Sequence, residues 1–286
     1  MTKLFIKLLY KIRLLKYFNL TTRIKVNRGS YKIPVINELG LDNITLSELW
    51  MSSILEKIIA IKDGTFIDIG VNTGQTLLKV KSLKPDIKYI GFEPNPNCVF
   101  YAQQLISINK IENTTLYPVG VAEVTKLVEL NFFTNESTDA SATIIADFRP
   151  GSKIYRKEII PCFEFKDISQ DNFGIISCIK IDVEGAELEV IKGLKEIIVK
   201  DKPFVLIEIL PVYEISNKDR MERQTALEET LNSIDYKMFR IHKNEEVGIK
   251  KLELIETIGV HSNIDWSDYI LCNEAMLPVL NAIVFE

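Results

Sequence analysis

The sequence of 286 residues is poor in cysteine and histidine and has no long apolar run. Its four cysteines (Cys98, Cys162, Cys178 and Cys272) stand far apart, with no C-x-x-C pair and no histidines at ligand spacing. This pattern excludes the common zinc and redox motifs, so we expect unpaired thiols and no metal. No apolar stretch approaches the roughly 18 residues of a membrane span. With 47% hydrophobic and 26% charged residues, the chain can bury a sizeable core and stay soluble, and the unpaired thiols indicate a reducing cytoplasm.

Positive charge is concentrated at the start of the chain. Residues 1–37 hold nine of the 35 lysines and arginines and none of the 39 acidic residues. The rest of the chain therefore has 26 basic against 39 acidic side chains, a formal charge of −13. Nucleic-acid enzymes more often spread positive charge over the body of the protein, so we expect no nucleic-acid partner.

Residues 1–60 predict a basic, helical N-terminal extension. Lys3, Lys7 and Lys11 fall on one helical stripe, and four apolar side chains lie beside or opposite it: Leu4, Phe5, Leu8 and Leu15. Lysines interrupt the apolar residues every few positions, which excludes a secretory signal. Two interpretations stay open at this point. The helix contacts anionic lipid as a peripheral membrane anchor, or it packs on its own subunit or a partner subunit.

From residue 61 to 286, apolar strand-like runs alternate with helical patterns. The expected strands are 65–70, 88–93, 116–122, 175–182 and 203–209, with closing strands at 237–242 and 269–272. Helices are expected up to residue 83, from Asn95-Pro96 onward, after the strand 175–182 with Leu188, Ile191, Leu194 and Ile198 on one face, and over 219–234. Near-continuous apolar strands separated by helices predict an α/β fold with a doubly wound, mostly parallel, Rossmann-like sheet. Its ligand should lie outside the carboxyl ends of the strands, at the switch point beside the first strand.

The first of these strands runs into a glycine-containing loop, Asp68-Ile-Gly70-Val-Asn72-Thr-Gly74. Two glycines around Asn72 let the backbone turn sharply and approach a ligand closely. A dinucleotide fingerprint would need glycine at 72 and 75, where the chain has Asn72 and Gln75. No G-K-[ST] closes the loop, so it is not a phosphate P-loop either.

The second strand ends in Glu93, nineteen residues past Gly74. A carboxylate at this place can accept hydrogen bonds from both hydroxyls of a ribose. Together, loop and acid predict a nucleoside ligand without a pyrophosphate, which S-adenosylmethionine matches. Taken separately, the glycines could form only a tight turn, and Glu93 could be a surface residue.

Three segments carry a family resemblance. Residues 66–74 read FIDIGVNTG, residues 91–96 read GFEPNP, and residues 179–193 read IKIDVEGAELEVIKG. They resemble the FkbM family of S-adenosylmethionine-dependent methyltransferases, with a looser likeness over 119–123. The resemblance covers about residues 62–245 and leaves out the basic N-terminus.

The resemblance implies a class I methyltransferase fold, S-adenosylmethionine as the methyl donor and, usually, O-methylation in glycan or natural-product pathways. By matching position, it implies that the methionine side of the cofactor is bound by Asp68, Gly70, Asn72 and Gly74. It also implies that Glu93 binds the ribose, that Val121 and Ala122 flank the adenine, and that Asp182 and Glu184 face the reacting end.

Methyl transfer from a sulfonium needs an aligned acceptor, and a sugar hydroxyl also needs a base. Asp182 and Glu184 are two residues apart, which on a continuing strand puts both on one face. Glu184 could instead serve only to charge the start of the following helix. Glu208 at the end of the fifth strand is a further candidate. His261 is a candidate base as well, with a surface histidine as the alternative interpretation.

The sequence thus predicts an O-methyltransferase acting on a hydroxyl of a sugar or a glycan-linked acceptor. N-methylation or a small-molecule acceptor would use the same cofactor site. A protein of another class, a non-catalytic binding or scaffold protein of glycan assembly, would have no need for the intact loop and Glu93. Insertions at 134–160 and 243–266 are the expected places for an acceptor pocket.

Overall fold

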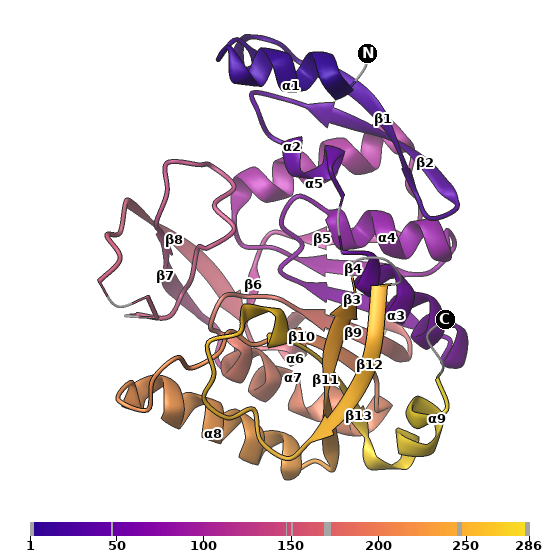
Figure 1. Ribbon diagram of the computed structural model, residues 1–286, viewed down its shortest axis with the longest axis vertical. Coiled ribbons are helices and arrows are strands. Elements are labelled where there is room, and N and C mark those ends of the chain that lie inside the picture. The colour runs from indigo at the N-terminus through magenta and orange to yellow at the C-terminus, as the bar shows by residue number, and fades with distance from the viewer. Residues whose placement is uncertain are drawn as a thin grey trace.

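An eight-stranded sheet forms the centre of the protein, with strand order β12-β11-β13-β10-β9-β3-β4-β5 (Figure 1). The computed structural model describes residues 3–46, 48–146, 148–149, 151–168, 173–244 and 248–283. In the order of the sheet, the strands are Gly248–Ile255, Tyr236–Asn244, Asp268–Asn273, Phe204–Glu208, Ile176–Ile181, Thr65–Ile69, Tyr89–Phe92 and Thr114–Tyr117. The five strands from β10 to β5 are parallel, and β13, β11 and β12 are antiparallel.

The path of the chain makes this sheet doubly wound. From β3 it moves outward to β4 and β5, and it then returns to β9 on the other side of β3 and continues to β10. The connections contain α4 (Gln75–Leu83), α5 (Pro96–Asn109) and α7 (Glu187–Asp201). The strand order therefore reverses between β3 and β9, which is where such a sheet binds its ligand. The predicted α/β, Rossmann-like class is confirmed.

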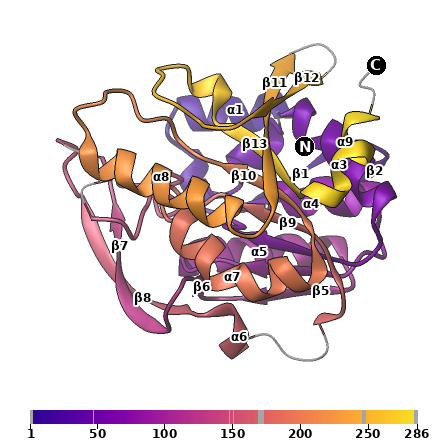
Figure 2. The same ribbon diagram turned by 90° about the horizontal axis from the view of Figure 1, so that it is seen from below.

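Two apolar layers cover the faces of the sheet. Ile67 of β3 packs in one core cluster with residues of α7 and α8 (Lys218–Asn232), which lie next to each other in Figure 2. Phe66, one residue earlier, packs in the opposite cluster with α4 and α3 (Leu49–Ile61). Successive strand residues point to opposite faces, so a strand covered on both sides must be apolar throughout.

The predicted strand 116–122 is wrong as a single element. Thr114–Tyr117 forms β5 of the main sheet, whereas Gly120–Val121 forms β6 of a separate sheet, ordered β6-β8-β7. The partners β7 (Lys126–Phe132) and β8 (Arg156–Phe163) pair antiparallel. Pro118 lies between β5 and β6, and because proline has no N–H and a fixed φ it cannot continue a ladder.

The N-terminal extension is not all helical, so that expectation is corrected. It has helices α1 (Lys3–Lys11), α2 (Leu41–Ile44) and α3, but a hairpin of β1 (Leu20–Val26) and β2 (Gly29–Val35) lies between α1 and α2. Buried and exposed residues alternate along β1 with the period of a strand. Asn27 takes φ +46° in the turn, a conformation asparagine tolerates.

The remaining boundaries follow the sequence closely. Asn95 caps α5 by accepting a hydrogen bond from the Asn97 amide (3.0 Å), with Pro96 in the first turn. The expected closing strands are present as β11 and β13, and the hairpin strand β12 is an addition that the pattern did not predict. None of the helices in the described part of the chain combines the length and apolar character that a bilayer crossing requires.

Candidate active site

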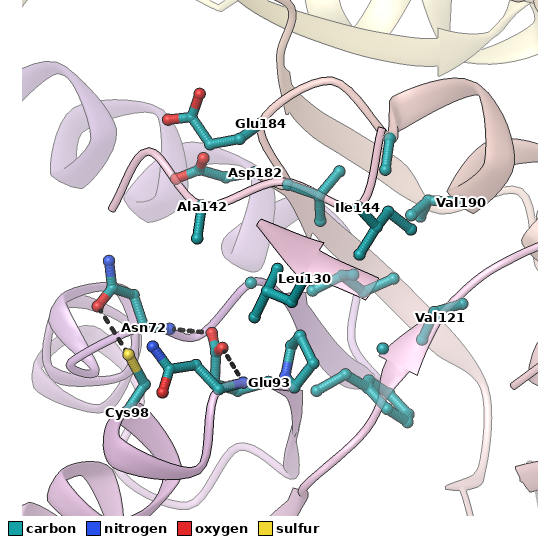
Figure 3. Close-up of a pocket in the computed structure, with 18 of the residues that line it drawn as sticks. Asn72, Glu93, Cys98, Val121, Leu130, Ala142, Ile144, Asp182, Glu184 and Val190 are labelled. Carbon is teal, nitrogen blue, oxygen red and sulfur yellow. Dashed lines mark hydrogen bonds between the residues drawn. The ribbon is translucent and has the colours of Figure 1, made fainter. Parts of the chain in front are cut away.

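A cavity of about 250 Å³ opens at the carboxyl ends of β3, β4, β9 and β10 (Figure 3). Residues 120–121, Leu130 of β7 and the segment 139–144 close its other side. Most of the side chains and glycines that the sequence singled out line this cavity: Gly70, Asn72, Glu93, Val121, Asp182, Glu184 and Glu208. Asp68, Gly74, Ala122 and His261 do not line it.

The loop after β3 is shaped by its glycines. Gly70 has φ +86°, and a Cβ built on it would lie 1.9 Å from the carbonyl oxygen of Asp182. Only glycine lets the ends of β3 and β9 approach this closely. Asn72 (φ +47°) and Gly74 (φ +82°) continue the turn, and Gly74 is the N-cap of α4 rather than part of the cavity wall.

Glu93 at the end of β4 is held by two backbone hydrogen bonds. Its Oε2 accepts from the Asn72 amide and its Oε1 from the Asn95 amide, both over 2.8 Å. Burial raises the pKa of the Glu93 carboxyl to about 7, although these two hydrogen bonds oppose the shift. Each oxygen keeps a further lone pair, so the fixed carboxylate can still accept from a ligand hydroxyl.

Asp68 lies beneath the loop instead of in the cavity. Its side chain is fully buried, accepts a hydrogen bond from the Tyr89 hydroxyl, and faces Lys180 at 3.4 Å. Burial raises the pKa of Asp68. The structure therefore places Asp68 where it supports the loop from below, away from the wall that a ligand would touch.

Lys180 of β9 joins the ends of the two central strands. Its Nζ donates to the carbonyl oxygen of Gly70 (2.9 Å) and lies 3.2 Å from Asp182 Oδ2. Burial disfavours its charge, but Asp182 and Asp68 outweigh burial and raise the pKa of Lys180. The ammonium therefore fixes the backbone of the glycine loop against the carboxylate side of the cavity. The sequence pattern gave no signal for this role.

One half of the cavity is apolar, with Val121, Leu130, Ile144 and Val190 gathered on one side in Figure 3. Ala122 lies just outside this wall. A Cβ on Gly193 of α7 would come within 2.2 Å of the Ala122 carbonyl oxygen, so the helix backbone packs directly against this segment. An apolar wall of this kind suits an aromatic base.

Three carboxyl groups meet at the opposite end of the cavity. Asp182 and Glu184 lie together in Figure 3, and Glu208 lines the same cavity. Burial, followed by the nearby Asp182, raises the pKa of Glu184 to about 7. Burial, followed by Asp182 and Asp268, raises the pKa of Glu208 to about 9. Burial and the neighbouring carboxylates therefore favour the protonated form of Glu208 and, less strongly, of Glu184.

The segment between β7 and β8 covers the cavity and contributes residues that sequence reasoning missed. Asp139 lines the wall, and its carboxylate is held by hydrogen bonds from Ser141 and from the Phe133 and Thr134 amides. Although burial opposes them, these bonds lower the pKa of Asp139. The insertion 134–160 was expected near the acceptor, but its polar sequence has no periodicity that would identify Asp139.

Two hydrogen bonds tie this covering segment to the strand ends. The Asn95 side-chain amide donates to the Ser137 carbonyl oxygen (2.9 Å), and Arg149 donates to Glu184 Oε2 (2.6 Å). Glu184 takes φ +52°, an uncommon conformation for glutamate. Arg149 lowers the pKa of Glu184 against the larger effect of burial. The turn and the arginine together fix where the Glu184 carboxyl points.

His261 is not part of this site. Its ring packs edge-on against Trp266, 5.6 Å between ring centres, and burial and Arg240 lower its pKa. Among the described residues, no group of three or more histidine, cysteine, aspartate or glutamate side chains is arranged to hold a metal ion.

The donor set fits S-adenosylmethionine. Glu93 offers a fixed carboxylate for a ribose diol, the apolar half offers a slot for adenine, and Gly70 with Asn72 forms a close backbone approach for the amino-acid end. The carboxyl groups of Asp182, Glu184 and Glu208 line the cavity away from its apolar half. These features are the ones that a nucleoside ligand without a pyrophosphate would require.

The chain is similar in sequence to a curated methyltransferase. A curated relative, the methyltransferase sdnD of Sordaria araneosa, is 24% identical over 161 residues. The match covers 46% of this chain and 60% of that protein. The chain therefore spans less than two thirds of that relative's length.

Two solved structures to which the chain is similar are described as methyltransferases. The methyltransferase FkbM of Methylobacillus flagellatus is 18% identical with a TM-score of 0.45, over 73% of this chain and 43% of that one. A putative caffeoyl-CoA O-methyltransferase of Staphylococcus aureus is 14% identical with a TM-score of 0.42, over 94% and 91%.

The assignment to a family rests on the sequence. Residues 68–239, which include the glycine loop, Glu93 and the carboxyl cluster, match the Methyltransferase FkbM domain. This is more than half of the chain, and it confirms the resemblance and the predicted cofactor. The chain belongs to the FkbM family of S-adenosylmethionine-dependent methyltransferases.

Proposed function

We propose that this protein transfers a methyl group from S-adenosylmethionine to a hydroxyl oxygen of a sugar or of a glycan-linked acceptor. When bound, the cofactor supplies the methyl group on a sulfonium, which makes it electrophilic. The observation that carries the proposal is the Glu184 carboxyl, which lines the cavity away from its apolar half and is fixed there by Arg149 (2.6 Å); burial, which raises its pKa to about 7, suits it to act as a base. A hydroxyl acceptor needs a base that is partly ionised at neutral pH, whereas a neutral amine needs none.

The three carboxyl groups have different parts in this proposal. Glu184 takes the acceptor proton, since its carboxyl is poised near neutrality and fixed by Arg149. Glu208, protonated at neutral pH, can donate a hydrogen bond to a second acceptor oxygen. Asp182, paired with Lys180, holds the edge of the cavity next to Gly70. Neighbouring hydroxyls are what a sugar offers to such a cluster.

We further propose that the reaction takes place in the cytoplasm. All four cysteines are unpaired and buried, which fits a reducing compartment.

The test is methyl transfer from isotopically labelled cofactor to cellular glycans and nucleotide sugars, followed by mass spectrometry of the product. The expected product has gained one CH₂, with the methyl on oxygen as an ether that survives mild alkali. Label on nitrogen, or an alkali-labile methyl ester, would refute hydroxyl methylation. Cofactor binding by calorimetry without turnover on any acceptor would favour a non-catalytic role instead.

Variants separate binding from chemistry. Glu184→Gln should lower turnover while the affinity for S-adenosylhomocysteine changes little, because Glu184 is proposed to act on the acceptor and not on the cofactor. If Glu184→Gln left turnover unchanged, the base assignment would be wrong, although the cofactor site would stand.

A further inference from the structure

One surface of the extension exposes apolar side chains among cations. We define the α1 face as Leu4, Lys7, Leu8 and Lys11 of α1 with Lys16 and Tyr17 of the following 3-10 turn η1 (Leu15–Tyr17). Leu4, Leu8 and Tyr17 are 79%, 53% and 71% exposed. Solvated helices normally turn such side chains inward, so this face calls for an explanation.

Helix α1 already packs against the rest of the chain through another face, so the α1 face is not the one that packs on the protein core. Ile6 and Leu9 of α1, together with Leu15, are buried in a cluster with the β1–β2 hairpin and with α4 and α5. Leu4 and Leu8 lie one turn apart and point away from Ile6 and Leu9. Lys7 and Lys11 form the adjacent stripe, also one turn apart.

The charge around the face is of one sign. No acidic residue occurs in residues 1–37, and Lys3, Arg13, Arg23 and Lys25 are exposed as well. The rest of the chain is net acidic. Figure 1 shows α1 and the hairpin at one end of the long axis, with α8 at the other end. The stretch that has basic but no acidic residues therefore lies at one end of the molecule.

We infer that the α1 face docks on the surface of an anionic lipid bilayer. Leucines between lysines are typical of a helix that lies in the interface, and tyrosine favours the level of the headgroups. The cations complement anionic headgroups. A second copy of the chain is a poorer occupant, because a two-fold contact would bring identical basic clusters together without an acidic partner. This inference does not depend on which acceptor is methylated.

The test is sedimentation of the full-length protein with vesicles of phosphatidylcholine alone or mixed with phosphatidylserine. We expect binding to the mixed vesicles, weak binding to the neutral ones, and release as ionic strength rises. The double variant Leu4→Ser/Leu8→Ser should bind mixed vesicles about tenfold or more weakly. Leu127→Ser is the control, since the exposure of Leu127 (71%) lies between those of Leu4 (79%) and Leu8 (53%), but Leu127 lies on β7.

Two results would overturn the inference. The first is no binding to mixed vesicles, or equal binding by the double variant and Leu127→Ser. The second is a dimer in light scattering that is absent in Leu4→Ser/Leu8→Ser, together with no binding of the wild type to vesicles. This result would show that the α1 face binds a second copy of the chain. Methyl transfer to a soluble acceptor should be the same in the double variant, so failure here is distinguishable from failure of the proposed reaction.

Discussion

The backbone amide of Asn72 donates a hydrogen bond of 2.8 Å to Oε2 of Glu93. Through this bond the loop after the first central strand and the acid after the second hold each other in place. The Asn95 amide occupies the other carboxylate oxygen, also at 2.8 Å. A ligand that binds Glu93 therefore meets a carboxylate whose position is already fixed, which lowers the entropic cost of binding.

Replacing Glu93 with Gln should weaken cofactor binding about 10- to 100-fold. Glutamine has one acceptor oxygen in place of two and carries no charge, so the charge-assisted hydrogen bonds are lost. Isothermal titration with S-adenosylhomocysteine measures the change. Glu112→Gln, on the exposed surface, is the control and should bind normally. Unchanged affinity in Glu93→Gln would contradict the ribose assignment.

The rate of methyl transfer should rise with pH through about 7 as Glu184 ionises. Arg149 lowers the pKa of Glu184, so Arg149→Gln should move this limb of the kcat profile to higher pH. The measurement is kcat against pH at saturating cofactor. A profile that keeps its midpoint in Arg149→Gln, while its height falls, would show that Arg149 acts in some other way.

Gly70→Ala should unfold the loop or the protein, since its Cβ would collide with the Asp182 carbonyl and its φ is +86°. Gly259→Ala is the matched control, with φ +76° but nothing within 4 Å of the added Cβ. Strain at positive φ alone costs about 1 kcal/mol, and a collision adds to it. Urea unfolding should therefore show a clearly larger decrease in the free energy of unfolding for Gly70→Ala than for Gly259→Ala. Equal decreases would show that the close contact with Asp182 does not destabilise the variant.

The pKa of Glu208, raised by burial from 4.5 to about 9, predicts how stability depends on pH. A group with a raised pKa in the fold contributes stability at low pH that is lost as pH rises from 4.5 towards 9. Glu208→Gln resembles the protonated acid and cannot ionise. The variant should therefore keep roughly 1–3 kcal/mol of unfolding free energy that the wild type loses as pH rises.

Thermal unfolding at about pH 5, 7 and 9 checks this. The gap between Glu208→Gln and wild type should widen as pH rises, in favour of the variant. Glu256→Gln, on an exposed side chain, should follow the wild type. A constant gap between Glu208→Gln and wild type would mean that Glu208 is ionised in the fold.

Much of the sheet could be predicted because its strands are apolar throughout. The segments that became β3, β4, β9 and β10 are buried on both faces, which leaves a continuous signal in the sequence. The β1–β2 hairpin was not predicted. Residues 1–60 were expected to be helical like α1, although the residues of β1 alternate between buried and exposed with the period of a strand. The strand 116–122 was drawn through Pro118, which the fold uses as a break.

Within the site, the sequence singled out residues that lie at strand ends but could not say which way each one faces. Glu93, Asp182 and Glu208 reach the cavity, whereas Asp68 turns to Tyr89 and Lys180 beneath it. His261 was considered for its chemistry alone, and the chain places it against Trp266. Asp139 had no pattern around it, because loops carry no periodicity.

The sequence by itself determined the central strands β3, β4, β9 and β10 with the helices between them, the glycine turn and the acid after β4, since hydrophobic periodicity and the need for glycine in a tight turn are local properties. Tertiary structure alone decided the pairing of Arg149 with Glu184, the buried tie from Lys180 to Gly70 and the raised pKa of Glu208. These depend on desolvation and on contacts between segments far apart in the chain, and no local pattern encodes either of them.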